Sequence, residues 1–398
     1  MPYRAIGLPG GCLLLTLFAT TRLAAATACL VPGQWAVPET NRAAPLPADR
    51  ALAQLARAQV VLLGESHEDR DHHRWQLQTI AGLYALRSGL TLGFEMFPRR
   101  VQPVLDRWVA GELPEAEFLA QSDWQRVWGM DASLYLPLFH FARLNRIPML
   151  ALNVERSLVR WVDAEGWAAI PPAEREGVTD PAPARPEYLE QLYQAFVEHQ
   201  PGGTAQQQPA AGAERSDRKF RQFVESMLVW DRAMAQALAD RLRNAGPLVV
   251  GIMGSGHVRD GDGVPRQLRD LGVTAVATAL PWDARLPCDE VRPTLATALF
   301  AIGATPEGVG ADRPRLGIAI QAAEGGVRVQ QVESGSVAEQ AGLQVGDLIA
   351  KAAGEPVREP ADLIATVSRQ PPGTWLPLLV QRGTGQPVEV VARFPARQ

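Results

Sequence analysis

The stretch Gln59-Val60-Val61-Leu62-Leu63-Gly64 decides the fold of the larger part of this 398-residue chain. It is a short, continuous apolar run, as expected of a strand that is buried on both faces of a parallel sheet. The polar sequence Glu65-Ser66-His67 follows directly, and a helical pattern then covers about residues 69–88. We therefore predict a buried strand, a polar turn and a helix in this order.

The same order of strand and helix repeats along the front of the chain. Further strands are predicted at 91–97, 147–154, 247–253 and 273–280, and helical patterns lie between them. This alternation favours an α/β domain with a mainly parallel sheet flanked by helices. Ligands of such sheets bind beyond the carboxyl ends of the strands, so the residues that follow each strand are candidates for a site.

Composition and charge limit the classes of function. The chain is 46% hydrophobic and 21% charged, with a net charge of −4, as is typical of a soluble globular protein. It has no strongly basic stretch, so we do not expect a nucleic-acid partner.

Residues 1–28 have the pattern of a signal peptide. Arg4 is followed by an apolar run at 13–19 and by small residues at 24–28 that suit a signal peptidase. The apolar run is short for a membrane span. We therefore expect an exported protein, either periplasmic or a membrane-associated lipoprotein.

The cysteines leave two alternatives open. Cys29 and Cys288 remain after such a signal is removed, and an even pair in an oxidising compartment favours a disulfide across the ends of the α/β domain. The alternative is lipid attachment at Cys29, although Ala26 stands where a lipoprotein signal usually has leucine.

Carboxylates and imidazoles follow three of the predicted strands. Glu65 and His67 follow the first, Glu95 ends the second, and His257 follows the strand at 247–253. Such groups bind a divalent metal such as zinc or manganese, or act as general acids and bases. The plainer alternative is that they cap helices and satisfy backbone groups. We interpret these four residues as metal ligands or, in an enzyme, as catalytic residues.

A cluster of aromatic side chains follows further along. It comprises Trp124, Trp128, Tyr135, Phe139, His140 and Phe141. One interpretation is core packing. The other is a wall for a large flat ligand, with Tyr135 as a candidate iron ligand, because phenolate coordinates ferric haem in some proteins.

These motifs together resemble a known family. Val61-Leu62-Leu63-Gly64-Glu65-Ser66-His67, Gly93-Phe94-Glu95-Met96, Trp230-Asp231-Arg232 and Gly254-Ser255-Gly256-His257 look like the motifs of ChaN-like haem-binding proteins in the haem-binding uptake and Tiki superfamily. The resemblance covers a domain at 49–290. It implies a haem-binding protein of iron uptake that holds haem through a tyrosine, here Tyr135, and that forms a homodimer. To Tyr135 we add His67 and His257 as candidate haem-binding residues.

The wider superfamily implies a different activity. It includes metal-dependent hydrolases and peptidases of the Tiki/TraB type, whose functional positions correspond here to Glu65, His67, Glu95 and His257. We favour a binding protein and keep a metal-dependent hydrolase, with a C-terminal domain that presents substrate, as the alternative.

The C-terminal residues 313–395, after a linker at 291–312, resemble the PDZ domains of bacterial HtrA-type proteases. Ser334-Gly335-Ser336-Val337-Ala338 and Val345-Gly346-Asp347-Leu348-Ile349 carry the resemblance. It implies a small, partly open β-barrel with helices that binds a peptide or protein C-terminus by strand addition. The expected peptide-binding residues are Leu316, Gly317, Ile318, Ala319, Ile320, Leu363, Ile364 and Val367.

Overall fold

The structure is a computed structural model, and it describes residues 29–198, 217–245, 248–303, 314–368, 370–383 and 385–395. The signal peptide predicted at 1–28 lies outside these residues. Within the described ranges, no helix combines the length and the apolar character needed to cross a membrane.

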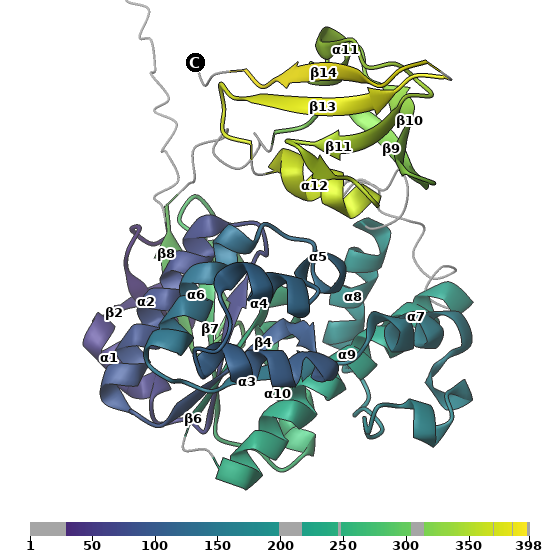
Figure 1. Cartoon of the computed structure of the whole chain (residues 1–398). Helices are drawn as coiled ribbons and strands as arrows, with labels where there is room; N and C mark the ends of the chain where they lie inside the picture. The colour runs from purple at the N-terminus through teal and green to yellow at the C-terminus, as the bar shows by residue number, and fades with distance from the viewer. Residues whose placement is uncertain are drawn as a thin grey trace, which may run out of the picture.

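An eight-stranded sheet forms the centre of the front domain (Figure 1). Its strand order is β2-β1-β8-β7-β3-β6-β4-β5. Six strands run parallel, and they are β3 (Val60–Glu65), β4 (Leu90–Pro98), β5 (Met149–Asn153), β6 (Leu248–Gly254), β7 (Val276–Asp283) and β8 (Ala298–Ile302). The antiparallel hairpin of β1 (Trp35–Glu39) and β2 (Arg42–Leu46) completes one edge. The predicted fold class is therefore confirmed.

Helices cover both faces of this sheet because successive strand residues point to opposite sides. Val61 and Leu63 of β3 pack in one core with α1 (Ala48–Leu55), α2 (Arg70–Leu86) and the helices from α3 to α6. Val60 and Leu62 pack in a second core with α9 (Arg218–Ala245) and α10 (Val264–Asp270). The remaining helices are α3 (Gln102–Val109), α4 (Glu115–Gln121), α5 (Trp124–Val127), α6 (Ala132–Leu144), α7 (Arg156–Glu165) and α8 (Pro186–Glu198).

The front domain extends beyond the expected limits of 49 and 290. The hairpin β1–β2 precedes residue 49, and β8 lies within the segment expected to be a linker. Five buried residues, Ala298–Ile302, form β8, which pairs with β7 on one side and with β1 on the other. A run of five apolar residues is too short to be distinguished from a linker by periodicity, but pairing on both sides gives it a place in the sheet.

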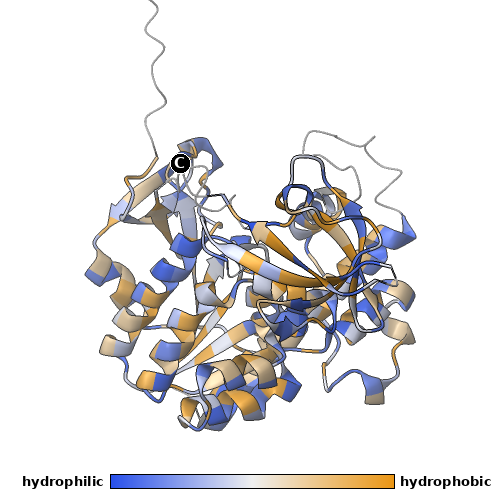
Figure 2. Ribbon diagram, turned by 45° about the horizontal axis from the view of Figure 1, so that its top comes forward, coloured by the Kyte–Doolittle hydropathy of each residue, from blue (hydrophilic) through white to orange (hydrophobic). Residues whose placement is uncertain are grey.

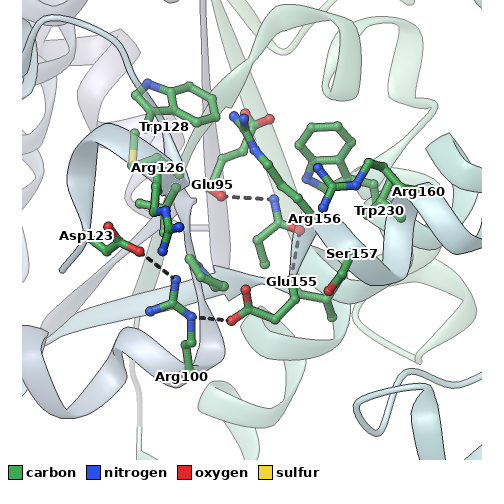
Figure 3. A pocket seen from close by; sticks show the side chains of 16 residues that line it. Glu95, Arg100, Asp123, Arg126, Trp128, Glu155, Arg156, Ser157, Arg160 and Trp230 are labelled. Carbon is green, nitrogen blue, oxygen red and sulfur yellow. Dashed lines mark hydrogen bonds and ion pairs between the residues drawn. The ribbon is translucent and has the colours of Figure 1, made fainter. Parts of the chain in front are cut away.

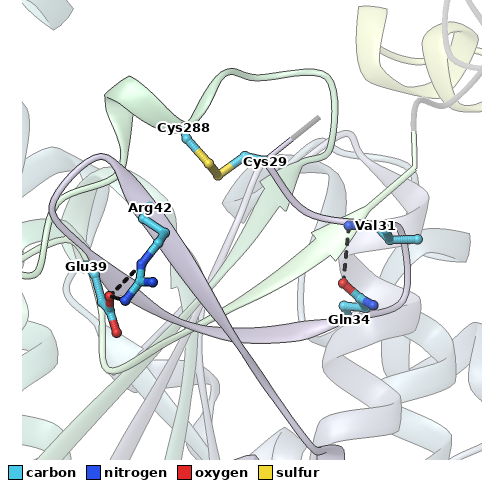
Figure 4. Close-up of a disulfide and its surroundings, with 6 residues drawn as sticks. All are labelled: Cys29, Val31, Gln34, Glu39, Arg42 and Cys288. Atoms are coloured by element: carbon cyan, nitrogen blue, oxygen red, sulfur yellow. Dashed lines mark hydrogen bonds and ion pairs between the residues drawn. A yellow bond between two sulfur atoms is a disulfide. The ribbon is translucent and has the colours of Figure 1, made fainter. Parts of the chain in front are cut away.

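A disulfide joins the two ends of this domain (Figure 4). Cys29 and Cys288 are bonded although they are 259 positions apart in the sequence. The bond holds the segment before β1 against the loop between β7 and β8. It therefore fixes the N-terminal segment beside β8, the strand with which the hairpin pairs.

The C-terminal domain has a separate antiparallel sheet with the order β14-β13-β11-β10-β9. Its elements are β9 (Ile318–Ala323), β10 (Gly326–Val332), α11 (Val337–Ala341), β11 (Leu348–Ala352), β12 (Glu355–Pro356), α12 (Pro360–Ser368), β13 (Trp375–Gln381) and β14 (Val388–Arg393). It has its own hydrophobic core, and the ribbon in Figure 2 shows hydrophobic residues concentrated along the strands of both sheets. Helix α12 lies against α5 of the front domain (Figure 1).

Candidate functional site

The first polar cluster is built around Glu65, the last residue of β3. This side chain is almost completely buried. Its Oε1 atom accepts hydrogen bonds from the His67 Nδ1 atom at 2.9 Å and from the Tyr135 hydroxyl at 2.8 Å. Its Oε2 atom lies 3.4 Å from the Nδ1 atom of His73 on α2. One carboxylate thus holds two imidazoles and a phenol in place.

Hydrogen bonds control the charge of this cluster. Burial alone would raise the pKa of Glu65, but the hydrogen bond from His67 and the nearby imidazole of His73 outweigh it and hold the pKa well below its ordinary value. Burial would lower the pKa of both imidazoles, but the Glu65 carboxylate raises it above the ordinary value. The cluster therefore combines a carboxylate with imidazoles that readily carry a proton.

Tyr135 is a buried partner of Glu65 in this structure. Its side chain on α6 has no exposed surface, and it packs against Trp124 and Phe139. Burial and the neighbouring Glu65 raise the pKa of its hydroxyl, so the phenol stays protonated. Tyr135 is therefore not placed to reach a ligand outside the core, in contrast with its expected role as an iron ligand.

The second polar cluster is built around His257, which follows β6. Its Nδ1 atom donates to Asp231 of α9 at 2.7 Å, and its Nε2 atom lies 3.5 Å from Glu95 of β4. The other Asp231 oxygen accepts from the hydroxyl of Tyr188 on α8 at 2.7 Å. Burial would lower the pKa of His257, but Glu95 and Asp231 raise it to about 9. The imidazole is thus a buried cation between two carboxylates.

Asp231 and Tyr188 were not expected as members of the site from the sequence. Asp231 occurs in the quoted motif Trp230-Asp231-Arg232, so a signal was present for it. Tyr188 had no comparable signal, because it lies on a helix distant in sequence from every strand end.

Gly254 brings the two clusters next to each other. Its backbone N–H donates to the Glu95 carboxylate at 2.7 Å. A Cβ atom at this position would lie 3.1 Å from the His67 ring and 3.7 Å from the His257 ring. Because β6 lies between β3 and β4 in the sheet, a residue without a side chain at its end leaves room for both imidazoles.

The four expected metal ligands divide between these clusters. Glu65 binds His67, whereas Glu95 binds His257. Among the residues that the structure describes, no group of three or more His, Cys, Asp or Glu side chains is arranged to hold a metal ion. The geometry does not support the alternative of a zinc or manganese site.

A cavity of about 690 Å³ lies beside the clusters, between α5 and α7 (Figure 3). Trp128 and Trp230 line it, and each also contacts one cluster. The ring centroid of Trp128 lies 4.8 Å from that of His67, and the centroid of Trp230 lies 5.7 Å from that of His257. The two indoles therefore separate the cavity from the imidazoles behind them.

Arginines give the cavity its charge. Arg100, Arg126, Arg156 and Arg160 line it, together with the acidic Glu95, Asp123 and Glu155. Arg100 is paired, because its side chain lies 2.6 Å from Glu155 and 3.5 Å from Asp123. The four arginines were not expected as site residues from the sequence. The one available signal was the spacing of Arg156 and Arg160, four residues apart after β5.

The expected peptide-binding residues lie along β9 and α12, which face each other across one side of the C-terminal domain. Strand β9 is at the edge of its sheet, so its outer side is open to another strand. Leu316, Leu363 and Val367 are buried in the core, whereas Ile364 is 52% exposed. Gly317 has φ = +75° and packs so closely on Ser336 that a Cβ atom would clash there. The expected set thus includes both core residues and residues open to a peptide.

Comparisons with known proteins assign both domains of the chain to families. The family described as haem-binding uptake, Tiki superfamily, ChaN matches residues 51–268, and the PDZ domain family matches residues 314–390. A structure of ChaN from Campylobacter jejuni, described as showing cofacial haem binding, is 15% identical. The match covers 67% of this chain and 96% of that chain, with a TM-score of 0.50.

The C-terminal domain is similar to parts of HtrA-type proteins. A serine endoprotease from Yersinia pestis is 29% identical over 22% of this chain and 30% of that chain, with a TM-score of 0.19. The HtrA3 PDZ domain is 26% identical over 20% of this chain and 82% of that chain, with a TM-score of 0.18. No curated protein matches this chain. Since the match at 51–268 covers more than half of the 398 residues, the chain belongs to the ChaN family of the haem-binding uptake, Tiki superfamily.

Proposed function

We propose that this chain is an exported protein that binds haem in the cavity between α5 and α7 and serves iron acquisition, and that its PDZ domain binds a peptide or protein partner. The observation that carries the haem proposal is the placement of His67. Its ring lies directly behind Trp128 of the cavity wall, and Glu65 holds its Nδ1 atom.

The cavity fits haem in size and in the chemistry of its walls. Its volume of about 690 Å³ is in the range of protein sites for small molecules, roughly 300–1,000 Å³. Trp128, Trp230 and Met96 supply aromatic and apolar surface for a flat ring system. Neither a tyrosine nor a histidine of the described residues lines the cavity. The imidazoles of His67 and His257 lie behind the indoles of Trp128 and Trp230, so either imidazole would reach the iron as an axial ligand only if its indole moved aside.

Of the two imidazoles, His67 suits that role better. Its side chain is 31% exposed, whereas that of His257 is 10% exposed. The Nε2 atom of His67 makes no hydrogen bond to any described residue, while both ring nitrogens of His257 face carboxylates. A hydrogen bond from Nδ1 to a carboxylate fixes the tautomer that leaves Nε2 to a metal and makes that nitrogen more basic. Haem supplies an iron centre that accepts such a nitrogen.

Two features support export. The residues at 1–28 have the pattern of a signal peptide. The disulfide between Cys29 and Cys288 belongs to an oxidising compartment such as the periplasm, since cytosolic thiols are kept reduced.

The PDZ proposal depends on the free edge of β9. A partner's extended C-terminus would add as a strand along Ile318 and Ile320. Within the described residues, the backbone N–H groups of Leu316 and Gly317 donate to no other group, so they are available to a terminal carboxylate.

Hemin titration tests the haem proposal. We expect the purified wild-type protein to give a Soret band that saturates with added hemin, and His67→Ala to lose most of it because the axial nitrogen is gone. His140→Ala is the matched control, because His140 is an exposed histidine of α6 that pairs with Glu115 away from the cavity. A wild-type protein that gives no saturable band would overturn the haem proposal, and an unchanged band in His67→Ala would overturn the assignment of His67.

A further inference from the structure

Three arginines of the cavity have no acidic partner in the part of the chain that the structure describes. Arg126 on α5 and Arg156 and Arg160 on α7 line it, and none of them forms an ion pair with a described residue. All three are exposed. Figure 3 shows Arg156 and Arg160 reaching from α7 toward the middle of the cavity, with Arg126 on the opposite side. The three carboxylates of the lining have other partners: Asp123 and Glu155 pair with Arg100, and Glu95 faces His257 and the Gly254 N–H.

This arrangement is unfavourable in the absence of an anion. Arg156 and Arg160 stand four residues apart on one helix, and like charges at this spacing repel each other. Arg156 is also the first residue of α7, where the helix dipole favours negative charge. The first turn of α7 has no acidic residue, and the N-cap residue Glu155 directs its side chain to Arg100. A bound anion would relieve both effects.

We propose that Arg126, Arg156 and Arg160 form an anion subsite that selects a flat ligand with carboxylates along one edge. This inference rests on the proposed function, under which those carboxylates are the two propionates of haem. Arginine suits this role because its planar guanidinium pairs with a carboxylate through two parallel hydrogen bonds. The indoles of Trp128 and Trp230 would contact the ring system while the arginines contact its acidic edge.

The test removes the charge from the ligand and from the protein in turn. Metal-free protoporphyrin IX and its dimethyl ester have the same ring system and differ in the two carboxylates. Arg156→Gln combined with Arg160→Gln should weaken binding of the diacid roughly tenfold, as for two partly exposed ion pairs. It should leave binding of the ester unchanged. The diacid alone should bind more weakly as salt is raised from about 0.05 to 0.5 M, because salt screens exposed charges.

Arg50→Gln is the matched control, because Arg50 is an exposed arginine of α1 that does not line the cavity. It should bind both porphyrins like the wild type. An equal midpoint of thermal unfolding in the double variant and the wild type excludes a loss of fold. The single variant Arg126→Gln repeats the binding test for the arginine on α5. Each variant is compared in the full chain.

The outcomes separate this inference from the proposed function. If the wild type binds hemin but has equal affinity for the diacid and the ester, the anion subsite is wrong and the haem proposal is unaffected. Equal weakening of diacid and ester in the double variant also overturns the subsite. A third outcome is that inorganic phosphate binds the wild type but not the double variant, and that the diacid is not preferred over the ester. These arginines would then be a phosphate site. Absence of hemin binding overturns both proposals.

Discussion

The two polar clusters at the sheet edge contain the same pair of residue types, yet their surroundings differ. In the cluster of Glu65, the imidazole of His67 keeps one nitrogen without a hydrogen bond to a described residue, and its side chain is partly exposed. In the cluster of His257, carboxylates face both imidazole nitrogens, and Tyr188 holds the second oxygen of Asp231. A carboxylate–imidazole pair can therefore offer a site for a ligand or complete the core, according to whether one nitrogen is left free.

The two clusters also differ in the energetic cost of losing a carboxylate partner. His257 is a cation enclosed in the core, so each of its carboxylate partners offsets a large cost of desolvation. His67 remains in contact with solvent, so loss of its partner costs less. Loss of a carboxylate partner of His257 should therefore act mainly on stability, and loss of the His67 imidazole mainly on ligand binding.

The largest expected effect is that of Asp231→Ala. It leaves the His257 imidazolium buried with Glu95 as its one remaining carboxylate, and it also removes the acceptor of the Tyr188 hydroxyl. We expect the free energy of unfolding to fall by about 3–5 kcal/mol, as for other broken buried ion pairs. Urea unfolding followed by circular dichroism measures this change.

The matched control for Asp231→Ala is Asp71→Ala. Asp71 pairs with Arg74 at 2.9 Å on the exposed side of α2, so its loss should cost at most about 1 kcal/mol. Similar costs for the two variants would contradict the assignment of Asp231 to a buried ion pair.

A smaller effect is expected from pH. The pKa of His257 is about 9 in the folded protein and near its ordinary value of 6.5 in the unfolded chain. The folded state holds the proton of His257 more tightly than the unfolded chain does. Protonation of His257 therefore stabilises the fold fully below about pH 6.5, and this stabilisation is lost as the pH rises through about 9. The wild type should lose about 3 kcal/mol of stability across this window.

Unfolding curves at intervals between pH 6 and pH 10 measure the pH effect, and His257→Gln should flatten the dependence. A residual slope of the same sign is expected in that variant, because the pKa values of His67 and His73 are raised as well. A variant as steep as the wild type would show that His257 does not carry the effect.

Much of the sheet edge could be predicted from the sequence. Buried parallel strands are continuous apolar runs, and their carboxyl ends meet at one edge, so Glu65, His67, Glu95 and His257 could be expected to lie near each other. The division of these four residues into two ion-paired groups could not be predicted. It depends on which side chains α6, α8 and α9 bring over the edge, and the helical positions of Tyr135 and Asp231 carry no strand-end signal.

The charge of the cavity could not be predicted from the sequence either. An arginine in a sequence does not show whether a carboxylate neutralises it in the fold. Arg100 and Arg126 look equivalent in the sequence, yet Arg100 has two acidic partners and Arg126 has none among the described residues. The short strand β8 was missed for a related reason, because its place in the sheet depends on pairing with β1 from the other end of the domain.

The smallest expected effect, that of Tyr135→Phe, separates the two roles within the Glu65 cluster. The substitution removes one hydroxyl donor to Glu65, while His67 continues to donate to the same oxygen. We expect a loss of about 1–2 kcal/mol in the free energy of unfolding, the usual contribution of a hydrogen bond to a charged acceptor. The Soret band with hemin should stay, since the hydroxyl faces the core and His67 is unchanged. Tyr84→Phe, on a tyrosine of α2 that contacts Phe141, is the matched control and should change neither quantity. If Tyr135→Phe abolished the band and Tyr84→Phe did not, Tyr135 would have to leave the core to bind iron, and the Glu65 cluster would open when haem binds.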